Sequence, residues 1–501
     1  MTFTTKSRWH VLATAIAALL LITLDNSILY TALPTLEREL GASPGESLWI
    51  INAYPLVMAG LLLGAGTLGD RVGHRTMLLA GLGIFGVASL VAAFAPTAAA
   101  LIAARAFLAV GAAAMMPATL AVIRTSFQDE RERTFAIAIW GSMSLVGFGL
   151  GPILSGLLLH WFWWGSVFLI NVPVVIVAVI GVILYAPKPR PDVSKSWDFQ
   201  SSAMSLMTMG GLVLAIKEAV NPAASWQMPA VALAISVVFG FLFVRRQGRL
   251  EHPSLDFNLF RNPALSAGII AAAAGLFGFA GLQLITSQRF QLVSGFTPTE
   301  AGLLVSVVIL GAIPMSLIGG AFLHRLGLRN LISGGLGLAA LAAVGVAVGL
   351  NHGVLWVAIG ILAMGIGLGA SMSVASTGII GNAPVEQAGM AASMEEVSFE
   401  FGALLAVALL GSLLAALYSL GLVLPAGAPE AARSSLSEAL TIAEAGGPQS
   451  EALWTAAATA FDRSYVVVLY VVAAVLGFGA VVTGVLLRRY GPGSQSTLYP
   501  H

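Results

Sequence analysis

The chain has 501 residues, of which 58% are hydrophobic and only 9% are charged, and its formal net charge is +1. A soluble globular protein carries about 25% charged residues, so this composition excludes an ordinary soluble domain and gives no sign of nucleic-acid binding. The sequence contains no cysteine, which excludes disulfides and thiolate chemistry. Many uncharged apolar runs are about 20 residues long, enough to cross a bilayer. The sequence therefore predicts an all-α polytopic membrane protein.

The apolar runs predict fourteen spans. The first holds Asp25 and has no small-residue cleavage site, so we expect a retained span and not a removable signal peptide. In chain order the spans are expected at about 10–33, 48–69, 77–95, 98–122, 135–158, 164–186, 199–219, 227–244, 263–287, 299–322, 331–350, 354–376, 388–418 and 464–487. Eighteen of the 24 Lys and Arg side chains then fall on the side of the N-terminus and four on the other. By the positive-inside rule, both termini are expected in the cytoplasm.

A repeat divides the chain into two related halves. The stretch Gly66-Thr-Leu-Gly-Asp70-Arg71-Val-Gly73-His-Arg75 lies between the second and third spans, and a weaker copy at 320–329, in which Arg325 matches Arg71, lies between the tenth and eleventh. Matched six-helix halves would place the copy two spans earlier, so two spans are inserted. We predict an N-terminal six-helix bundle at 1–187, a Pro-rich linker with two inserted spans at 188–262, and a C-terminal six-helix bundle at 263–501.

The C-terminal bundle is expected to contain a long outer loop at 419–463. Its part at 430–445 is rich in Ala, Leu and Glu and could form a short helix or a hairpin. The role of the two inserted spans stays open between packing beside the halves and shaping a lateral entrance from the lipid.

Ionisable side chains within membrane spans are functional candidates by default. Asp25 in the first span and Arg105 in the fourth lie at similar depths, so they are expected to face each other, either in proton or cation coupling or as a structural ion pair. The thirteenth span carries Glu395, Glu396 and Glu400, of which the last two share a helix face. Two carboxylates on one face of an apolar helix do not both ionise readily, so one is expected to exchange a proton near neutral pH. Alternatively, Glu395 and Glu396 lie at the cytoplasmic mouth.

Small and aromatic residues complete the candidate machinery. Gly147, Gly151, Pro152 and Gly156 in the fifth span allow close helix contact and bending. Five side chains could line a pocket for flat cations through cation–π contacts, although packing or contact with lipid explains each one alone better: Tyr54, Met115, Trp140, Phe148 and Phe277. All seven His lie at span ends or beyond, so no intramembrane metal site is expected. Without a nucleotide-binding glycine loop, the energy is expected to come from an ion gradient.

Together these motifs resemble the major facilitator superfamily, and specifically its fourteen-helix drug:proton antiporter branch. The resemblance rests on the loop motif at 66–75, the first-span motif at 24–34, the antiporter motif at 147–156 and the sixth-span signature Trp163-Trp-Gly-Ser-Val-Phe-Leu-Ile-Asn171-Val-Pro173. The fourth-span motif departs from the family pattern, because Arg105 is kept but Leu108 and Ala109 stand where an amide is usual. The segments 391–395 and 399–402 are similar to the thirteenth span of pumps that export quaternary ammonium compounds and methyl viologen.

The resemblance implies a proton-coupled exporter of lipophilic cations that works by alternating access in the bacterial cytoplasmic (inner) membrane. Asp25, Arg105 and the span 13 glutamates would couple cations to protons, and Gly66, Asp70, Arg71, Gly73, Arg75 and Arg325 would form the inner gate. We expect no cofactor, a monomer in the lipid bilayer, and a transporter that is not an enzyme. The alternatives are an exporter of the same fold for a non-cationic metabolite, siderophore or lipid, an ion channel, or a membrane-embedded enzyme.

Overall fold

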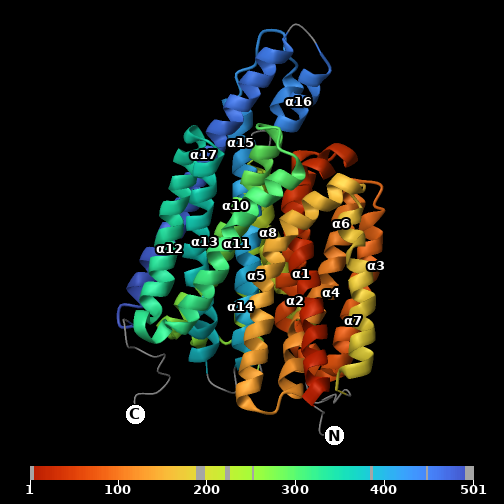
Figure 1. Cartoon of the computed structure of the whole chain (residues 1–501), viewed down its shortest axis with the longest axis vertical. Coiled ribbons are helices and arrows are strands. Elements are labelled where there is room, and N and C mark those ends of the chain that lie inside the picture. Colours follow the sequence, from red (N-terminus) through yellow and green to blue (C-terminus); the bar gives the residue numbers. More distant parts are fainter. Residues whose placement is uncertain are drawn as a thin grey trace.

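Long helices make up the protein. The computed structural model describes residues 5–187, 198–219, 226–250, 253–383, 388–446 and 449–490, and these residues contain no β-strand. Within them, thirteen helices are long and apolar enough to cross a membrane, and α2 becomes a fourteenth if its bent halves count as one span. The helices run side by side, with the start of α1 and the end of α17 at the same end of the bundle (Figure 1). The predicted all-α fold with fourteen spans is confirmed.

The first six predicted spans correspond to seven helices. They are α1 (Thr5–Leu40), α2 (Pro44–Val72), α3 (His74–Ala93), α4 (Ala98–Ser126), α5 (Glu130–Trp161), α6 (Ser166–Leu169) and α7 (Asn171–Tyr185). Polar caps mark several starts, such as the capping box of Ser43 and Glu46 at α2. The sixth span consists of α6 and α7, which meet at Ile170, where the backbone stays helical and Pro173 has no N–H to continue the hydrogen-bond pattern of α6.

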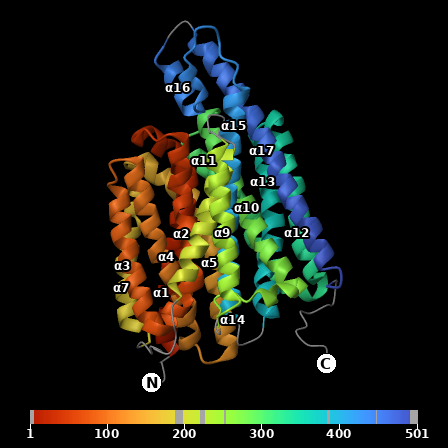
Figure 2. The same cartoon turned by 180° about the vertical axis from the view of Figure 1, so that it is seen from behind.

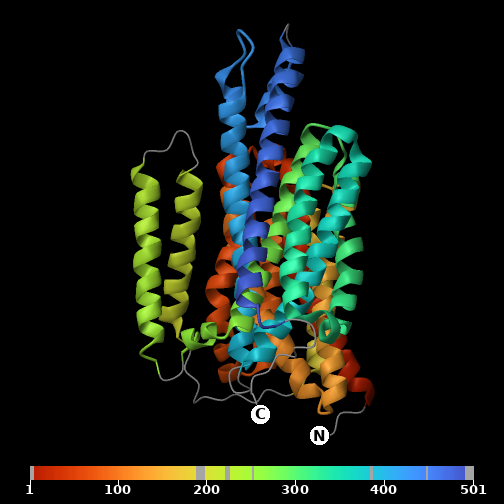
Figure 3. The same ribbon diagram turned by 90° about the vertical axis from the view of Figure 1, so that its left-hand side faces the viewer.

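The two inserted spans form a helical hairpin, α8 (Phe199–Ala219) and α9 (Gln227–Gln247). They stand to one side of the other helices (Figure 3). The hairpin contacts α2 through α8, where Leu56, Val213, Leu404 and Ala408 form a small apolar cluster separate from the main core. The outer face of α9 is apolar and exposed, as expected for contact with lipid. The Pro-rich linker predicted from residue 188 lies, up to residue 197, outside the described residues.

The last six predicted spans follow a short 3-10 helix. The elements are η1 (Phe257–Arg261), α10 (Pro263–Leu292), α11 (Pro298–Ala321), α12 (Leu323–Gly349), η2 (Leu350–His352), α13 (Val354–Ile379), η3 (Ile380–Asn382), α14 (Ala388–Leu405), η5 (Ala406–Gly411), α15 (Ser412–Gly421), η6 (Glu430–Arg433), α16 (Leu436–Glu444) and α17 (Ser450–Leu486). A π-helical segment, η5, joins α14 to α15. Such π-turns are frequent at functional sites.

The sequence repeat has a counterpart in the backbone. Gly73 ends α2 with φ of 90°, and Gly327, at the same place in the second copy, has φ of 77°. Both values lie in the left-handed region, which a side chain would strain. The two glycines are therefore required by the same sharp turn, and this turn is a structural signature shared by the two halves of the chain.

The segment expected as a long loop at 419–463 is mostly helical. The helix α15 runs on to Gly421 and α17 already begins at Ser450, fourteen residues before the predicted span. Between them, the Arg433 guanidinium donates hydrogen bonds to the carbonyls of Ser419 (3.2 Å) and Leu422 (2.7 Å) and so caps α15. Hydropathy marks the part of a helix that lies in lipid, and the Ala-rich start of α17 continues the helix beyond it. This segment projects from one end of the bundle (Figures 1 and 3).

Backbone contacts join α5 to α11. A Cβ atom added to Gly302 of α11 would lie 2.8 Å from the carbonyl carbon of Pro152, and one added to Gly156 would lie 2.7 Å from the backbone nitrogen of Thr299. The hydroxyl of Ser306 also donates to the carbonyl of Gly149 (2.9 Å). The close helix contact predicted from the small residues of the fifth span is thus confirmed. Figure 2 shows α5 and α11 among the helices at the centre of the bundle.

Candidate functional site

Asp25 of α1 and Arg105 of α4 form a buried ion pair. Both side chains are fully buried, and Arg105 Nη1 donates to Asp25 Oδ2. Arg105 Nε donates to the carbonyl of Ile50 on α2 (3.2 Å), and the guanidinium lies 4.5 Å from the ring centroid of Tyr54. The pairing predicted from their matching depths is confirmed. Removing one partner of such a pair leaves an uncompensated buried charge, which is strongly unfavourable.

Asn171 holds the second oxygen of the Asp25 carboxylate. Its Nδ2 donates to Asp25 Oδ1 (2.8 Å) and also reaches Ser89 Oγ of α3 (3.3 Å). Asn171 is the first residue of α7 and is buried. In the sequence, Asn171 was noted only as part of the sixth-span signature. The signal that could have found it is a neutral amide within an apolar span, because a buried amide requires a hydrogen-bond partner.

The three glutamates of α14 differ in their surroundings. Glu395 accepts a hydrogen bond from Ser376 Oγ of α13 (3.1 Å). Glu400 is also buried and lies within electrostatic range of Arg105 of α4 and of the hydroxyls of Tyr30 and Tyr54. Glu396 is half-buried and lies near both other carboxylates. Glu400 is therefore the glutamate that faces the first six spans, whereas Glu395 faces its own half of the chain.

Several polar atoms around this ion pair are left without partners. Within the described part of the chain, Arg105 Nη2, Glu400 Oε2 and the hydroxyls of Tyr30 and Tyr54 are buried and make no hydrogen bond. We call Asp25, Arg105, Asn171, Tyr30, Tyr54 and Glu400 the central polar cluster. Unsatisfied buried groups are costly and gather where a protein binds or reacts. Chemically, Arg105 Nη2 can pair with a second carboxylate, and Glu400 can bind a proton or a cation.

The five aromatic and methionine candidates lie in different surroundings. Tyr54 belongs to the central polar cluster, and Phe148 packs edge-on against Phe279 of α10, with ring centroids 6.0 Å apart. Gln283 of α10 donates to the carbonyl of Phe148 (3.3 Å). Met115 instead packs against α3, because a Cβ at Gly81 would lie 2.7 Å from its Cγ. Trp140 and Phe277 are buried, and no hydrogen bond to the indole nitrogen of Trp140 is found among the described residues.

The residues of the predicted gate contact one another and the ends of neighbouring helices. His74 Nε2 lies 3.1 Å from Asp70 Oδ1, and Arg75 donates to the carbonyl of Ile183 at the end of α7 (2.7 Å). Arg71 is exposed, and Gly66 faces Ser393 of α14, which a Cβ would approach to 3.9 Å. Arg325 of the second copy lies over the ring of Phe322, 5.7 Å from its centroid.

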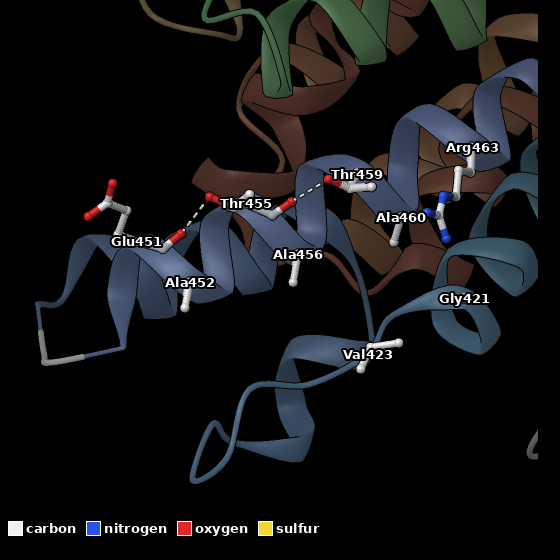
Figure 4. A pocket seen from close by; sticks show the side chains of 9 residues that line it. All are labelled: Gly421, Val423, Glu451, Ala452, Thr455, Ala456, Thr459, Ala460 and Arg463. Atoms are coloured by element: carbon white, nitrogen blue, oxygen red, sulfur yellow. Dashed lines mark hydrogen bonds between the residues drawn. The ribbon is translucent and has the colours of Figure 1, made fainter.

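A surface groove lies away from the central polar cluster, in the projecting segment. It measures about 650 Å³ and runs between α17 and the residues that follow α15 (Figure 4). The hydroxyls of Thr455 and Thr459, which line it, donate to backbone carbonyls one turn earlier. Among the described residues, no group of three or more His, Asp or Glu is arranged to hold a metal ion.

Comparison with known proteins identifies the family. The family model described as Major Facilitator Superfamily matches residues 15–294 and 288–428. The methyl viologen resistance protein SmvA of Salmonella typhimurium is 37% identical over 469 residues, covering 92% of this chain and 94% of SmvA. The multidrug efflux pump LfrA of Mycolicibacterium smegmatis is 36% identical over 499 residues, covering 97% and 98%. A crystal structure of a bacterial homolog of the human lysosomal transporter Spinster shares the fold, with a TM-score of 0.68 at 15% identity over 97% of this chain and 98% of that chain. The chain therefore belongs to the Major Facilitator Superfamily of secondary transporters.

Proposed function

We propose that this protein is a proton-coupled multidrug exporter of lipophilic, quaternary ammonium-type cations. Relatives that match nearly its whole length are named for methyl viologen resistance and for multidrug efflux. Methyl viologen is a flat organic dication, so carboxylates and aromatic rings are the groups that would bind such a molecule. The central polar cluster supplies both in a buried place.

The observation that carries the proposal is the position of Glu400. This buried carboxylate comes from the C-terminal part of the chain and lies within electrostatic range of Arg105, which already pairs with Asp25 in the N-terminal part. Glu400 Oε2 and Arg105 Nη2 make no hydrogen bond within the described residues. Cation and proton would compete for these carboxylates, with Glu395 and Glu396 as further acceptors nearer the start of α14. Because cation and proton cannot occupy the same carboxylate together, export of the cation would be coupled to uptake of a proton.

Alternating access would then move residues 1–187 against residues 263–501, with the insert at 188–262 beside them. We assign the end of the bundle where α1 starts and α17 ends to the cytoplasm and the projecting segment to the outside of the inner membrane, following the Lys and Arg distribution. The α5–α11 contact would close the outer side, and the loops of the two repeats, with Asp70, Arg71, Arg75 and Arg325, would close the inner side.

Ethidium transport tests the proposal. In energised everted vesicles, the protein should accumulate ethidium, and a proton uncoupler should abolish the accumulation. A folded and inserted protein that moves no ethidium would favour the exporter of a non-cationic metabolite, siderophore or lipid. Downhill flux that the uncoupler leaves unchanged would instead indicate a channel.

Glu400→Gln tests the residue assignment in the same vesicles. The amide keeps the size of the side chain but neither binds a proton nor carries a negative charge, so uncoupler-sensitive accumulation should fall to the background of empty vesicles. The matched control is Glu444→Gln, at an exposed position of α16, which should transport at the wild-type rate. Wild-type accumulation by Glu400→Gln at equal protein level would refute the role of Glu400.

A further inference from the structure

We propose that Asn171 is the positioning residue that holds the Asp25 carboxylate in its ionised form and aims it at Arg105. The inference rests on the proposed function, in which Asp25 takes up and releases a proton. The inference assigns a role in proton coupling to Asn171, which is itself uncharged.

The hydrogen bonds of Asp25 are divided between two donors. Arg105 Nη1 donates a hydrogen bond to Asp25 Oδ2, and Asn171 Nδ2 donates one to Asp25 Oδ1 (2.8 Å). A hydrogen bond donated to a carboxylate favours the ionised state, because a protonated carboxyl oxygen is itself a donor and accepts a hydrogen bond less strongly than a carboxylate oxygen does. Asn171 therefore opposes protonation of Asp25 even when Arg105 turns away.

The backbone fixes Asn171 in this position. Asn171 opens α7 directly after the junction at Ile170, and Pro173 lies in the first turn of α7, where a missing N–H leaves no intrahelical hydrogen bond of α7 unmade. The same Nδ2 atom contacts Ser89 Oγ of α3 (3.3 Å), which limits rotation of the amide. Asn171 is only 2% exposed, so water does not compete freely for its hydrogen bonds.

Among the residues that the structure describes, few ionisable groups lie near Asp25. Arg105 of α4 pairs with it, Tyr54 of α2 lies against the Arg105 guanidinium, Tyr30 is on the same helix as Asp25, and Glu400 of α14 lies within electrostatic range of Arg105. The neighbouring helices α5, α7, α10 and α11 carry ionisable side chains only near their ends. Asn171 is thus the neutral donor by which α7 acts on the proton affinity of Asp25.

Infrared titration of the purified full-length protein tests this inference without relying on transport. Protonated carboxyl groups give a carbonyl band, and the part of it lost in Asp25→Asn belongs to Asp25. In Asn171→Leu, measured against Asp25→Asn/Asn171→Leu, the midpoint of this band should move to higher pH by about one to two pH units, the worth of a hydrogen bond to a charged group. Asn171→Ala should give the same shift and serves if the leucine variant does not fold.

The matched control is Asn382→Leu. Asn382 is equally buried, but its Nδ2 donates to the carbonyl of Thr377 in the other half of the chain. This variant should leave the midpoint of Asp25 unchanged. An unchanged midpoint in both folded Asn171 variants would overturn the inference, and so would an equal shift in Asn382→Leu.

Failure of this inference and failure of the proposed function are distinguishable. Uphill ethidium export that persists in Asp25→Asn would refute the coupling role of Asp25, whatever the infrared midpoint shows. Loss of export in Asp25→Asn, together with an unshifted infrared band in the folded Asn171 variants, would refute only the role of Asn171.

Discussion

The contact between α5 and α11 offers a direct test of how the two halves of the chain separate. In Gly302→Ala, the new Cβ would lie 2.8 Å from the carbonyl carbon of Pro152 and 3.4 Å from the backbone nitrogen of Ile153. Carbon atoms in contact normally lie about 3.5–4.0 Å apart, so the two helices must separate by about 1 Å. Because the obstacle is backbone, no side chain can turn aside to make room.

Overpacking of this kind costs about 1–3 kcal/mol. The cost falls only on the conformation in which α5 touches α11, so the equilibrium between that conformation and one with the helices apart should shift by about 5- to 150-fold. The control is Gly141→Ala on α5, where an added Cβ meets no atom within 4 Å.

Pulsed electron spin resonance measures this shift. The chain has no native cysteine, so spin labels can be placed on Leu157→Cys of α5 and Leu303→Cys of α11, both exposed positions. Gly302→Ala should add a population with a longer distance between the labels, and Gly141→Ala should not. Identical distance distributions in both variants and in the parent protein would refute the argument that backbone contact at Gly302 holds these helices together.

Two further predictions concern the α8–α9 hairpin. Gly211→Ala should lower the thermal unfolding temperature in detergent, because its Cβ would lie 2.8 Å from the Ala232 carbonyl oxygen and from the Ser236 nitrogen. The control Gly210→Ala should not lower this temperature, because Leu56 comes no closer than 3.8 Å to the added Cβ. Equal effects of the two variants would contradict the packing argument. At the base of the hairpin, partial burial opposes ionisation of Asp198, but hydrogen bonds from Arg246 and Ser201 still hold the pKa of Asp198 below its usual value. Asp198→Asn should therefore unfold at a lower temperature than the parent at neutral pH. The difference should shrink as the pH falls below about 4 and the native carboxylate becomes protonated, and a difference that persists in acid would show that ionisation of Asp198 does not stabilise the hairpin.

The ion pair of Asp25 and Arg105 could be predicted because each is an isolated charge in an apolar span. Two antiparallel helices of known length fix the depth of such charges, and the cost of an unpaired charge in lipid then requires that they meet. The contrast between Glu395 and Glu400 could not be predicted in the same way. Helical periodicity gives the angle between two side chains, but it does not say which neighbouring helix each one faces.

Helix ends were the least predictable part of the fold. A polar cap such as Ser43 reveals the start of α2 in the sequence, whereas α17 starts fourteen residues before its apolar run with no capping side chain. The packing of Met115 against α3 could not be predicted either, because it depends on the space left by Gly81, and a glycine in an apolar helix gives no sequence signal for the side chain that fills this space.

The length of α17 has a mechanical consequence. This helix has 37 residues without an internal proline, so at 1.5 Å per residue it is a rod of about 55 Å. It packs along α12 within the bundle and along α16 in the projecting segment. A rotation of about 15°, typical of rigid-body domain movements, would carry the far end of the rod by about 14 Å relative to its inner end. A fluorophore on α16 would thus magnify a small tilt of the C-terminal helices into a displacement that single-molecule distance measurements can follow.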